Sequence, residues 1–214
     1  MTGSLIIITS PSGGGKGTLI AELMKTGIGV AYSVSYTTRP RRQAEEDGRE
    51  YTFISVPEFE RLIKEDEFLE YARVHDNYYG TSRSRVDTLV RGGEDVILEI
   101  DVQGAENVLK IRPDAVSIFI LPPSFEALAD RLRARNTETQ SQLELRLRNS
   151  LYEVIRYTEF TYVVVNDNVA DAVGKLEAII LAERQRRTRQ DDAIRVILDS
   201  FEASKTLVSE EKGS

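Results

Sequence analysis

The sequence has 214 residues, which is enough for one α/β domain that carries smaller inserted domains. Hydrophobic residues make up 41% and charged residues 29%, a balance typical of a globular protein and not of a disordered or membrane protein. The formal net charge of −7 disfavours nucleic acid as a partner, and the absence of cysteine excludes disulfides, thiol nucleophiles and zinc-thiolate sites.

The first expected element is a buried strand at Leu5–Thr9. Its apolar run ends at Ile8, whereas a signal peptide needs roughly 7–15 apolar residues and a transmembrane helix about 20. We therefore expect a cytoplasmic protein that has no membrane partner.

A glycine-rich segment, residues 10–18, follows this strand and precedes a helix expected at 18–25. It resembles the phosphate-loop pattern G-x-x-x-x-G-K-[ST], except that Ser10 replaces the first glycine and Gly17 replaces the hydroxyl residue. Glycines let backbone N–H groups converge on phosphate oxygens, and the helix N-terminus and Lys16 add positive potential. The alternative interpretation is a glycine-rich helix cap. The predicted ATP-binding residues of this loop are Ser12, Gly13, Gly14, Gly15, Lys16, Gly17 and Thr18.

The stretch from about residue 32 to residue 80 interrupts the α/β pattern with alternating polar and apolar residues, which predicts a mainly β insertion. A short helix is expected at 57–66. Arg39 and Arg42 lie on a turn-forming segment, and arginine forks suit a phosphate dianion. Residues 45–47 are interpreted as a plain acidic loop without a functional role.

The rest of the chain alternates between β-branched runs and segments with helical periodicity. The expected strands are 95–100, 115–120 and 162–165, and the expected helices are 124–134, 144–157 and 169–187. This order predicts an α/β fold in which helices cover a parallel sheet. A terminal helix and a frayed tail are expected after about residue 188.

Arginines surround a polar segment at residues 135–140. Arg131 and Arg135 are separated by one helical turn and so face the same side of a helix, and Arg146 follows the segment. This arrangement is a candidate lid. The alternative is a solvated helix face on which the arginines pair with Glu138 and Glu144.

Together these motifs resemble the guanylate kinase family. The glycine-rich loop, the arginine turn, and segments 77–81, 99–104 and 165–167 occur in the family's order over about residues 5–185. The resemblance implies a P-loop NTPase-type parallel sheet covered by helices, with a β-rich GMP-binding insertion and a helical lid. It also implies transfer of the γ-phosphoryl group of ATP to GMP, and to dGMP, giving ADP and GDP.

The resemblance also assigns the acceptor site. The residues implied to bind the GMP phosphate are Arg39, Arg42, Tyr51 and Tyr79, and those implied to contact guanine are Ser35, Glu70, Thr81 and Asp101. The chemistry agrees, because a carboxylate accepts from guanine N1–H and the amino group together, a donor pair that adenine lacks. Taken singly, Glu70 could be a surface acid, Asp101 a helix N-cap and the tyrosines strand-edge packing.

The implied lid closes on ATP through Arg131, and Asn166 lies beside the adenine, although an Asn-Asp pair after a strand is also a common turn. The residues implied to be catalytic are Lys16, Arg39, Arg135 and Arg146. The attacking GMP phosphate is already ionised near neutral pH, so no general base is required. Mg²⁺ is expected to accompany ATP. Its candidate ligands are Thr18, Glu99 and Asp101.

The expected domains follow from these assignments. The core comprises residues 1–34, 82–124 and 160–190, the GMP-binding domain 35–81, the lid 125–159 and the C-terminal helix and tail 191–214. Two other functions stay open: a non-catalytic guanylate kinase-like module that binds proteins, and a related P-loop kinase for another phosphorylated acceptor such as a ribose bisphosphate. No oligomeric state is predicted.

Overall fold

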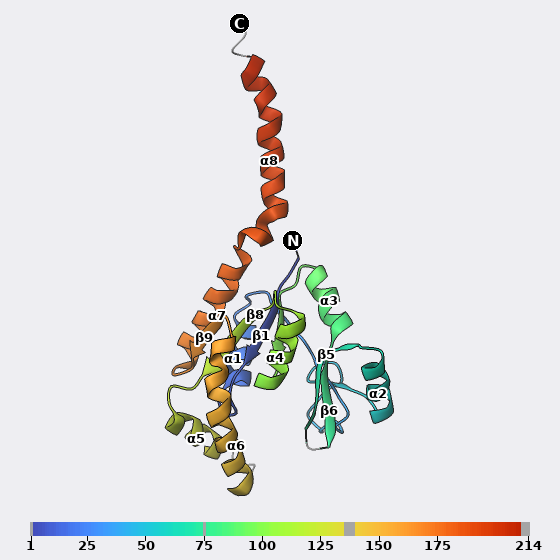
Figure 1. Ribbon diagram of the computed structural model, residues 1–214, viewed down its shortest axis with the longest axis vertical. Helices are drawn as coiled ribbons and strands as arrows, with labels where there is room; N and C mark the ends of the chain where they lie inside the picture. The colour runs from blue at the N-terminus through green and yellow to red at the C-terminus, as the bar shows by residue number, and fades with distance from the viewer. Residues whose placement is uncertain (1, 75, 135–139, 211–214) are drawn as a thin grey trace.

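The computed structural model describes residues 2–74, 76–134 and 140–210. Its centre is a five-stranded sheet in the order β2-β7-β1-β8-β9, in which all neighbouring strands are parallel (Figure 1). The strands are β1 (Leu5–Thr9), β2 (Ala31–Tyr32), β7 (Val96–Glu99), β8 (Val116–Leu121) and β9 (Tyr162–Val165). The predicted α/β fold with a parallel sheet is therefore confirmed.

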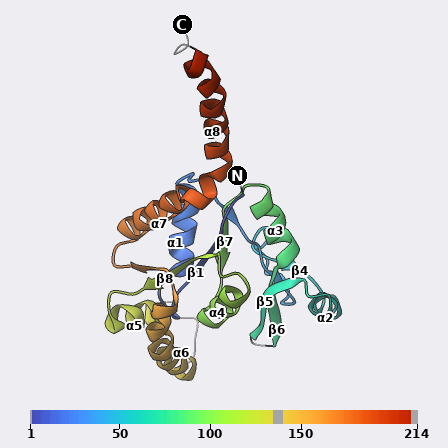
Figure 2. The same ribbon diagram turned by 45° about the horizontal axis from the view of Figure 1, so that its top comes forward.

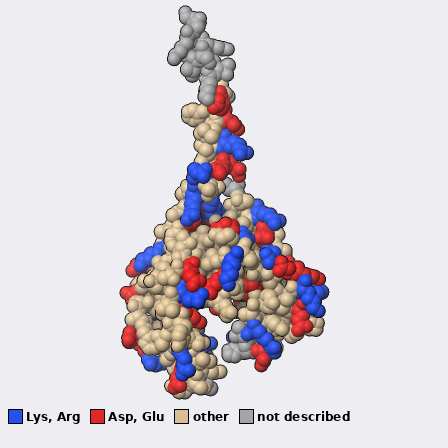
Figure 3. All heavy atoms as spheres, viewed as in Figure 1, with Lys and Arg blue, Asp and Glu red and all other residues tan. Residues whose placement is uncertain are grey.

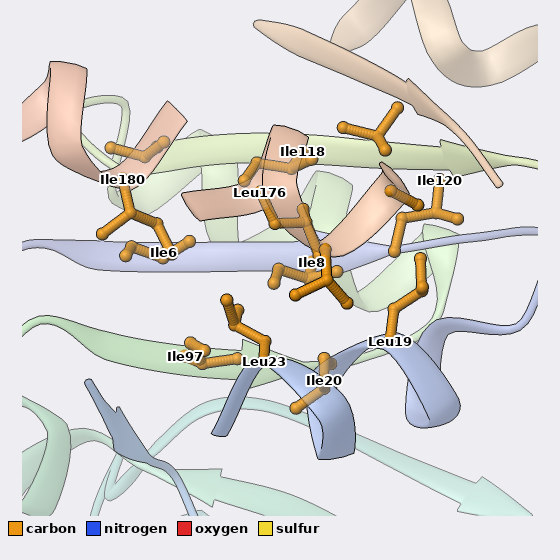
Figure 4. Packing of buried hydrophobic residues seen from close by; sticks show 14 residues of the cluster. Ile6, Ile8, Leu19, Ile20, Leu23, Ile97, Ile118, Ile120, Leu176 and Ile180 are labelled. Atoms are coloured by element: carbon orange, nitrogen blue, oxygen red, sulfur yellow. The ribbon is translucent and has the colours of Figure 1, made fainter. Parts of the chain in front are cut away.

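β1 is apolar at successive positions and buried along its whole length, as is typical of a strand in a sheet that is covered on both faces. Ile6 and Ile8 pack with the cluster that includes Leu19 and Leu23 of α1 (Lys16–Lys25) and Leu176 of α7 (Val169–Arg184), as Figure 4 shows. The opposite face of β1 belongs to a second cluster with α4 (Val102–Ile111) and with Val86 of α3 (Arg83–Arg91). Helices thus cover the sheet on both sides (Figure 2).

A second, four-stranded sheet forms the insertion, in the order β4-β3-β6-β5. Its strands are β3 (Tyr36–Thr37), β4 (Thr52–Phe53), β5 (Phe68–Val74) and β6 (Asn77–Ser82), and α2 (Val56–Lys64) covers it. Phe59 of α2 is fully buried and stacks on Phe68, with 4.4 Å between ring centroids. A Cβ at Gly80 would lie 2.9 Å from both rings, so only glycine fits beneath this stack.

Two helices form the predicted lid region, α5 (Phe125–Ala134) and α6 (Gln140–Glu153), and a 3₁₀ turn, η1 (Val154–Glu159), follows. The predicted helix at 144–157 begins too late and wrongly includes part of this turn. The expected helices do not include α3 and α4, although the N-cap alternative for Asp101 points to the start of α4. Each of these begins at an N-cap whose side chain accepts a backbone N–H, Ser82 for α3 and Asp101 for α4.

The C-terminal helix α8 (Arg187–Glu210) projects from the body of the molecule (Figure 1). An ion-pair cluster on Asp95, at the start of β7, anchors its base. The Asp95 carboxylate lies 2.7 Å from Nε of Arg184 and 3.0 Å from Nη2 of Arg189, and it also accepts the backbone N–H of Ser4. Within the described ranges, none of the helices is both long and apolar enough to span a bilayer.

Replacing Asp95 with alanine is expected to lower the free energy of unfolding by about 3 kcal/mol, because two guanidinium groups would lose a buried partner. Bonds from both arginines hold the pKa of Asp95 below its usual range, although burial opposes them. The stabilisation is therefore present above about pH 4 and is lost as the pH falls through the depressed pKa.

Urea denaturation measures the effect of Asp95→Ala on the free energy of unfolding. Asp114→Ala, which removes a mostly exposed partner of Arg112, should change stability far less, and equal losses would contradict the role of burial.

Candidate active site

The phosphate loop lies between β1 and α1, at the carboxyl end of the central strand. Gly13 and Gly15 adopt positive φ angles of 85° and 89°, which residues with side chains rarely tolerate. A Cβ at Gly15 would lie 2.4 Å from Nδ2 of Asn166, so this position also lacks space. The loop backbone therefore requires the glycines that the motif predicted.

Lys16 begins α1 and its ammonium group turns toward the end of β7. Nζ donates to the carbonyl oxygen of Ile100 at 3.0 Å and lies 3.7 Å from Oε1 of Glu99. The other oxygen of Glu99 accepts from the Tyr32 hydroxyl at 3.0 Å. Burial, and next the negative charge of Glu99, raise the pKa of Tyr32 far above its ordinary value, so this hydroxyl remains a donor. The lysine is thus held at the loop by a weak ion pair and one carbonyl.

Gly17 explains part of the departure from the common motif. A Cβ at this position would lie 3.3 Å from Oε1 of Glu99, a tight contact that glycine avoids. Thr18 is exposed on the first turn of α1. At residue 17, where the motif has a hydroxyl side chain, the Glu99 carboxylate therefore lies close to the loop.

Asn166 and Arg131 form the far side of the loop. Nδ2 of Asn166 donates to the carbonyl of Gly14 at 3.0 Å, and Nη2 of Arg131 donates to the carbonyl of Asn166 at 2.8 Å. Oδ1 of Asn166 and Nη1 of Arg131 are both buried without a hydrogen-bond partner in the part of the chain that the structure describes. Unsatisfied buried polar atoms are costly. Their position beside the phosphate loop suits a ligand that carries both donors and acceptors.

Glu70 lies on β5 and is partly enclosed. The Thr81 hydroxyl donates to its Oε1 at 2.8 Å. Burial raises the pKa of Glu70 to about 7; the charge of Asp101 adds to this rise, while the Thr81 hydrogen bond and Lys16 oppose it. A Cβ at Gly104 would lie 3.3 Å from Oε2 of Glu70 and 3.1 Å from Oδ1 of Asp101, so the two carboxylates border the same small space.

Asp101 has a structural role as well, because its Oδ1 accepts the backbone N–H of Gly104 at 2.7 Å and caps α4. The alternative interpretation of Asp101 as an N-cap is therefore confirmed. The cap orients the side chain while it still lies beside Glu70.

Aromatic rings and one carboxylate surround Arg39. Its guanidinium carbon lies 5.4 Å from the ring centroid of Tyr51, which in turn contacts Tyr79 edge to face at 5.7 Å. Nη2 lies 2.7 Å from Oε1 of Glu45, and Nη1 lies 3.1 Å from Oε2. The interpretation of residues 45–47 as a plain acidic loop is therefore wrong for Glu45. The turn folds back and brings this carboxylate onto Arg39.

The structure shows fewer contacts for the remaining predicted site residues. Ser35 contributes its backbone carbonyl, which accepts from Thr52 N–H at 2.9 Å. The side chain of Arg42 is exposed, and Arg146 lies half-buried on α6. Arg135 lies outside the described residues.

The two lobes that carry these groups are separated by open space, visible in Figure 3 between the lobe of α5 and α6 and the lobe of β5 and β6. Glu153, at the end of α6, reaches the phosphate loop and accepts the N–H of Ser12 at 2.9 Å. No local sequence pattern predicts this contact, since the two residues are 141 positions apart.

The site suits Mg²⁺ that is held mainly by the phosphates of a nucleotide. Among the described residues, no group of three or more His, Cys, Asp or Glu side chains could hold a metal ion alone. Mg²⁺ commonly binds one or two carboxylates and completes its shell with water and substrate phosphates. Glu99, which contacts both Lys16 and Tyr32, is a carboxylate beside the loop that could serve in this way.

Sequence and structure similarity relate this chain to known proteins. The guanylate kinase family model matches residues 2–183. Guanylate kinase from Hydrogenovibrio crunogenus is 45% identical over 201 residues, covering 94% of this chain and 98% of the relative. Guanylate kinase from Symbiobacterium thermophilum is 48% identical over 192 residues, covering 90% of this chain and 91% of the relative. The crystal structure of guanylate kinase from Anaplasma phagocytophilum matches with a TM-score of 0.69 and 32% identity, covering 88% of this chain and 89% of that one.

Proposed function

Because the chain belongs to the guanylate kinase family and is an ATP:GMP phosphotransferase, we propose how its own residues divide the transfer of the γ-phosphoryl group. The observation that carries this assignment is the convergence of Lys16, Glu70, Glu99 and Asp101 at the ends of β1, β5 and β7. ATP and GMP then meet between the phosphate loop and the inserted sheet.

The ATP phosphates bind the loop of residues 12–18, where Gly13 and Gly15 let the backbone N–H groups point toward one ligand. Lys16 releases Ile100 and Glu99 and moves to the β- and γ-phosphates. Asn166 and Arg131 flank the nucleotide, and their unsatisfied Oδ1 and Nη1 atoms meet its polar groups. Thr18, on the first turn of α1, also binds ATP.

GMP binds the inserted sheet. Glu70 and Asp101 accept the N1–H and amino hydrogens of guanine, and Thr81 fixes the orientation of Glu70 through its hydrogen bond. Ser35, whose carbonyl accepts the N–H of Thr52 in the inserted sheet, completes the guanine contacts. Arg39, Arg42, Tyr51 and Tyr79 hold the phosphate, and the Tyr51 ring lies against the guanidinium group of Arg39.

Transfer then depends on alignment and charge neutralisation, since the GMP phosphate is ionised without a general base. Mg²⁺ that accompanies ATP would neutralise part of the negative charge that develops on the phosphates during transfer. Glu99 and Asp101 would hold this ion, with Thr18 as a further candidate ligand. The positive side chains that neutralise the transferring phosphoryl group are Lys16, Arg39, Arg135 and Arg146.

The proposed domains keep the sequence boundaries: a core of residues 1–34, 82–124 and 160–190, a GMP-binding domain of 35–81, a lid of 125–159 and a C-terminal segment of 191–214. The open space between the lobes supports a closing motion that brings lid arginines to the transferring group. Closure also excludes water from the site.

The test is ADP formation from ATP and Mg²⁺ with GMP, dGMP, AMP, CMP or UMP as the acceptor. We expect turnover with GMP and dGMP, and values of kcat/KM lower by about 10³-fold or more for the other acceptors. Comparable turnover of AMP would contradict the assignment of Glu70 and Asp101. A folded protein that transfers to none of the acceptors would instead favour the protein-binding module.

A further inference from the structure

The turn of residues 39–45 places a carboxylate against an arginine assigned to the substrate phosphate. Glu45 forms a bidentate pair with Arg39, and both side chains are only 14% exposed. Oε2 of Glu45 also accepts the backbone N–H of Arg42 at 2.8 Å, and its own N–H donates to the Arg42 carbonyl at 3.1 Å. One acidic side chain therefore connects the two arginines of the turn.

The hydrogen bonds of Arg39 show which edge of its guanidinium group is committed. Nη1 donates to the carbonyl of Pro40 at 2.8 Å and to Glu45 at 3.1 Å, and Nη2 donates to Glu45 at 2.7 Å. These bonds use both hydrogens of Nη1 and one of Nη2. A guanidinium group has five N–H donors, so the bonds to Pro40 and Glu45 leave the Nε–H and the second Nη2–H, with the Tyr79 hydroxyl as a further neighbour among the described residues. This Nε–Nη2 edge has the geometry that fits a phosphate.

The neighbours of Arg39 fix the plane of the group as well. The rings of Tyr51 and Phe53 lie 5.4 Å and 5.7 Å from its guanidinium carbon. Bonding to Glu45, and to a smaller extent to the Tyr79 hydroxyl, raises the pKa of Arg39 above its ordinary value. The guanidinium is thus held by a carboxylate on one edge and bordered by rings, with Tyr79 nearby.

We propose that Glu45 is a positioning residue for GMP: it holds the Nη1–Nη2 edge of Arg39 and the backbone of Arg42, so that the Nε–Nη2 edge of Arg39 faces the acceptor phosphate. The inference rests on the proposed assignment of Arg39 to that phosphate. It predicts that Glu45 stays on Arg39 when GMP is bound. The opposite arrangement, in which Glu45 occupies the phosphate position and competes with GMP, predicts the opposite sign for Glu45→Gln.

The test compares Glu45→Gln with the wild type at saturating ATP. We expect the KM for GMP to rise by about tenfold or more, because the amide nitrogen of glutamine cannot accept from the guanidinium and the oriented edge is lost. The KM for ATP and the Kd for guanosine, which lacks the phosphate, should stay within about twofold of wild type. Glu45→Asp keeps the charge on a shorter side chain and should recover part of the loss.

The matched control is Glu50→Gln, which removes the same charge from the same loop but leaves Arg39 untouched, since Glu50 pairs with Arg49. Its KM for GMP should equal that of the wild type. A lower KM for GMP in Glu45→Gln would show that Glu45 competes with the phosphate, and an unchanged KM would show that the pair only stabilises the turn. Either result overturns the inference.

Arg39→Lys separates this inference from the proposed function. If Arg39→Lys leaves the KM for GMP unchanged, the assignment of Arg39 to the phosphate fails. If Arg39→Lys raises it and Glu45→Gln does not, only the role of Glu45 fails. We expect both single variants to raise it, and the double variant to be little worse than Arg39→Lys alone, because Glu45 acts through Arg39.

Discussion

Replacing Lys16, the first residue of α1, with methionine is expected to lower kcat by about 10³-fold. The reason is that the ammonium group no longer neutralises the negative charge on the transferring phosphoryl group. Methionine keeps the length and apolar character of the stem, so the loop backbone should keep its shape. Among the described residues, Nζ is held only by the Ile100 carbonyl and by Glu99 at 3.7 Å, contacts that are easily exchanged for phosphate oxygens. The Kd for GMP, measured without ATP, should change little.

The control for Lys16→Met is Lys25→Met, at the other end of the same helix, where the ammonium pairs with Glu22 on the surface. Lys25→Met should keep wild-type kcat. A loss of less than tenfold for Lys16→Met in a folded protein would mean that the backbone N–H groups of residues 13–18 neutralise the phosphates without the lysine. Turnover under single-turnover conditions separates the chemical step from product release.

The phosphate loop was predictable because all its determinants are local. Strand, glycines, lysine and helix follow one another within residues 5–25, and Gly15 adopts the positive φ angle that the motif requires. The parallel sheet was predictable for a related reason, since β1 and β8 are apolar on both faces and alternate with helices. The guanylate kinase resemblance supplied the order of the remaining motifs.

The parts that were missed depend on contacts between distant residues or on polar signals that have several interpretations. Asp95 and Arg184 are 89 positions apart, so no sequence pattern relates them. Glu45 is separated from Arg39 by only six positions, but the pairing requires the turn at Pro40 to fold back, and an acidic run alone suggests solvent. Helix α4 was missed because Val102 follows β7 almost directly, and its start is marked only by the Asp101 cap.

Replacing Glu70 with glutamine is expected to lower kcat/KM for GMP by about 10²-fold and to narrow the preference for GMP over AMP, because two charge-assisted hydrogen bonds to guanine are lost. The amide can accept through only one atom, and its NH₂ group faces the guanine donors. Thr81 can still donate to the amide oxygen, so the local structure should persist. The control is Glu65→Gln on the surface, where the carboxylate pairs with Arg61.

The unusual pKa of Glu70 makes this prediction testable by pH as well. Burial raises the pKa to about 7, whereas guanine donors require the ionised carboxylate. GMP binding must therefore expel a proton at lower pH, so the affinity for guanosine should rise with pH and level off above about pH 7. Guanosine is the sharper ligand because it lacks the phosphate, whose own second pKa is about 6. In Glu70→Gln this dependence on pH should disappear.

The same shift links recognition to stability. A folded-state pKa raised above the ordinary value of 4.5 means that the folded protein holds a proton that the unfolded chain releases, so the stability of the free enzyme falls as the pH rises from about 4.5 to about 7. One pKa unit corresponds to about 1.4 kcal/mol, so Glu70→Gln should increase the free energy of unfolding at pH 8 by up to about 3 kcal/mol. If the variant is more stable but binds GMP more weakly, the ionised Glu70 carboxylate destabilises the free enzyme and is needed for guanine binding. Equal or lower stability at pH 8, measured by urea denaturation without GMP, would show that the ionised carboxylate is already well solvated.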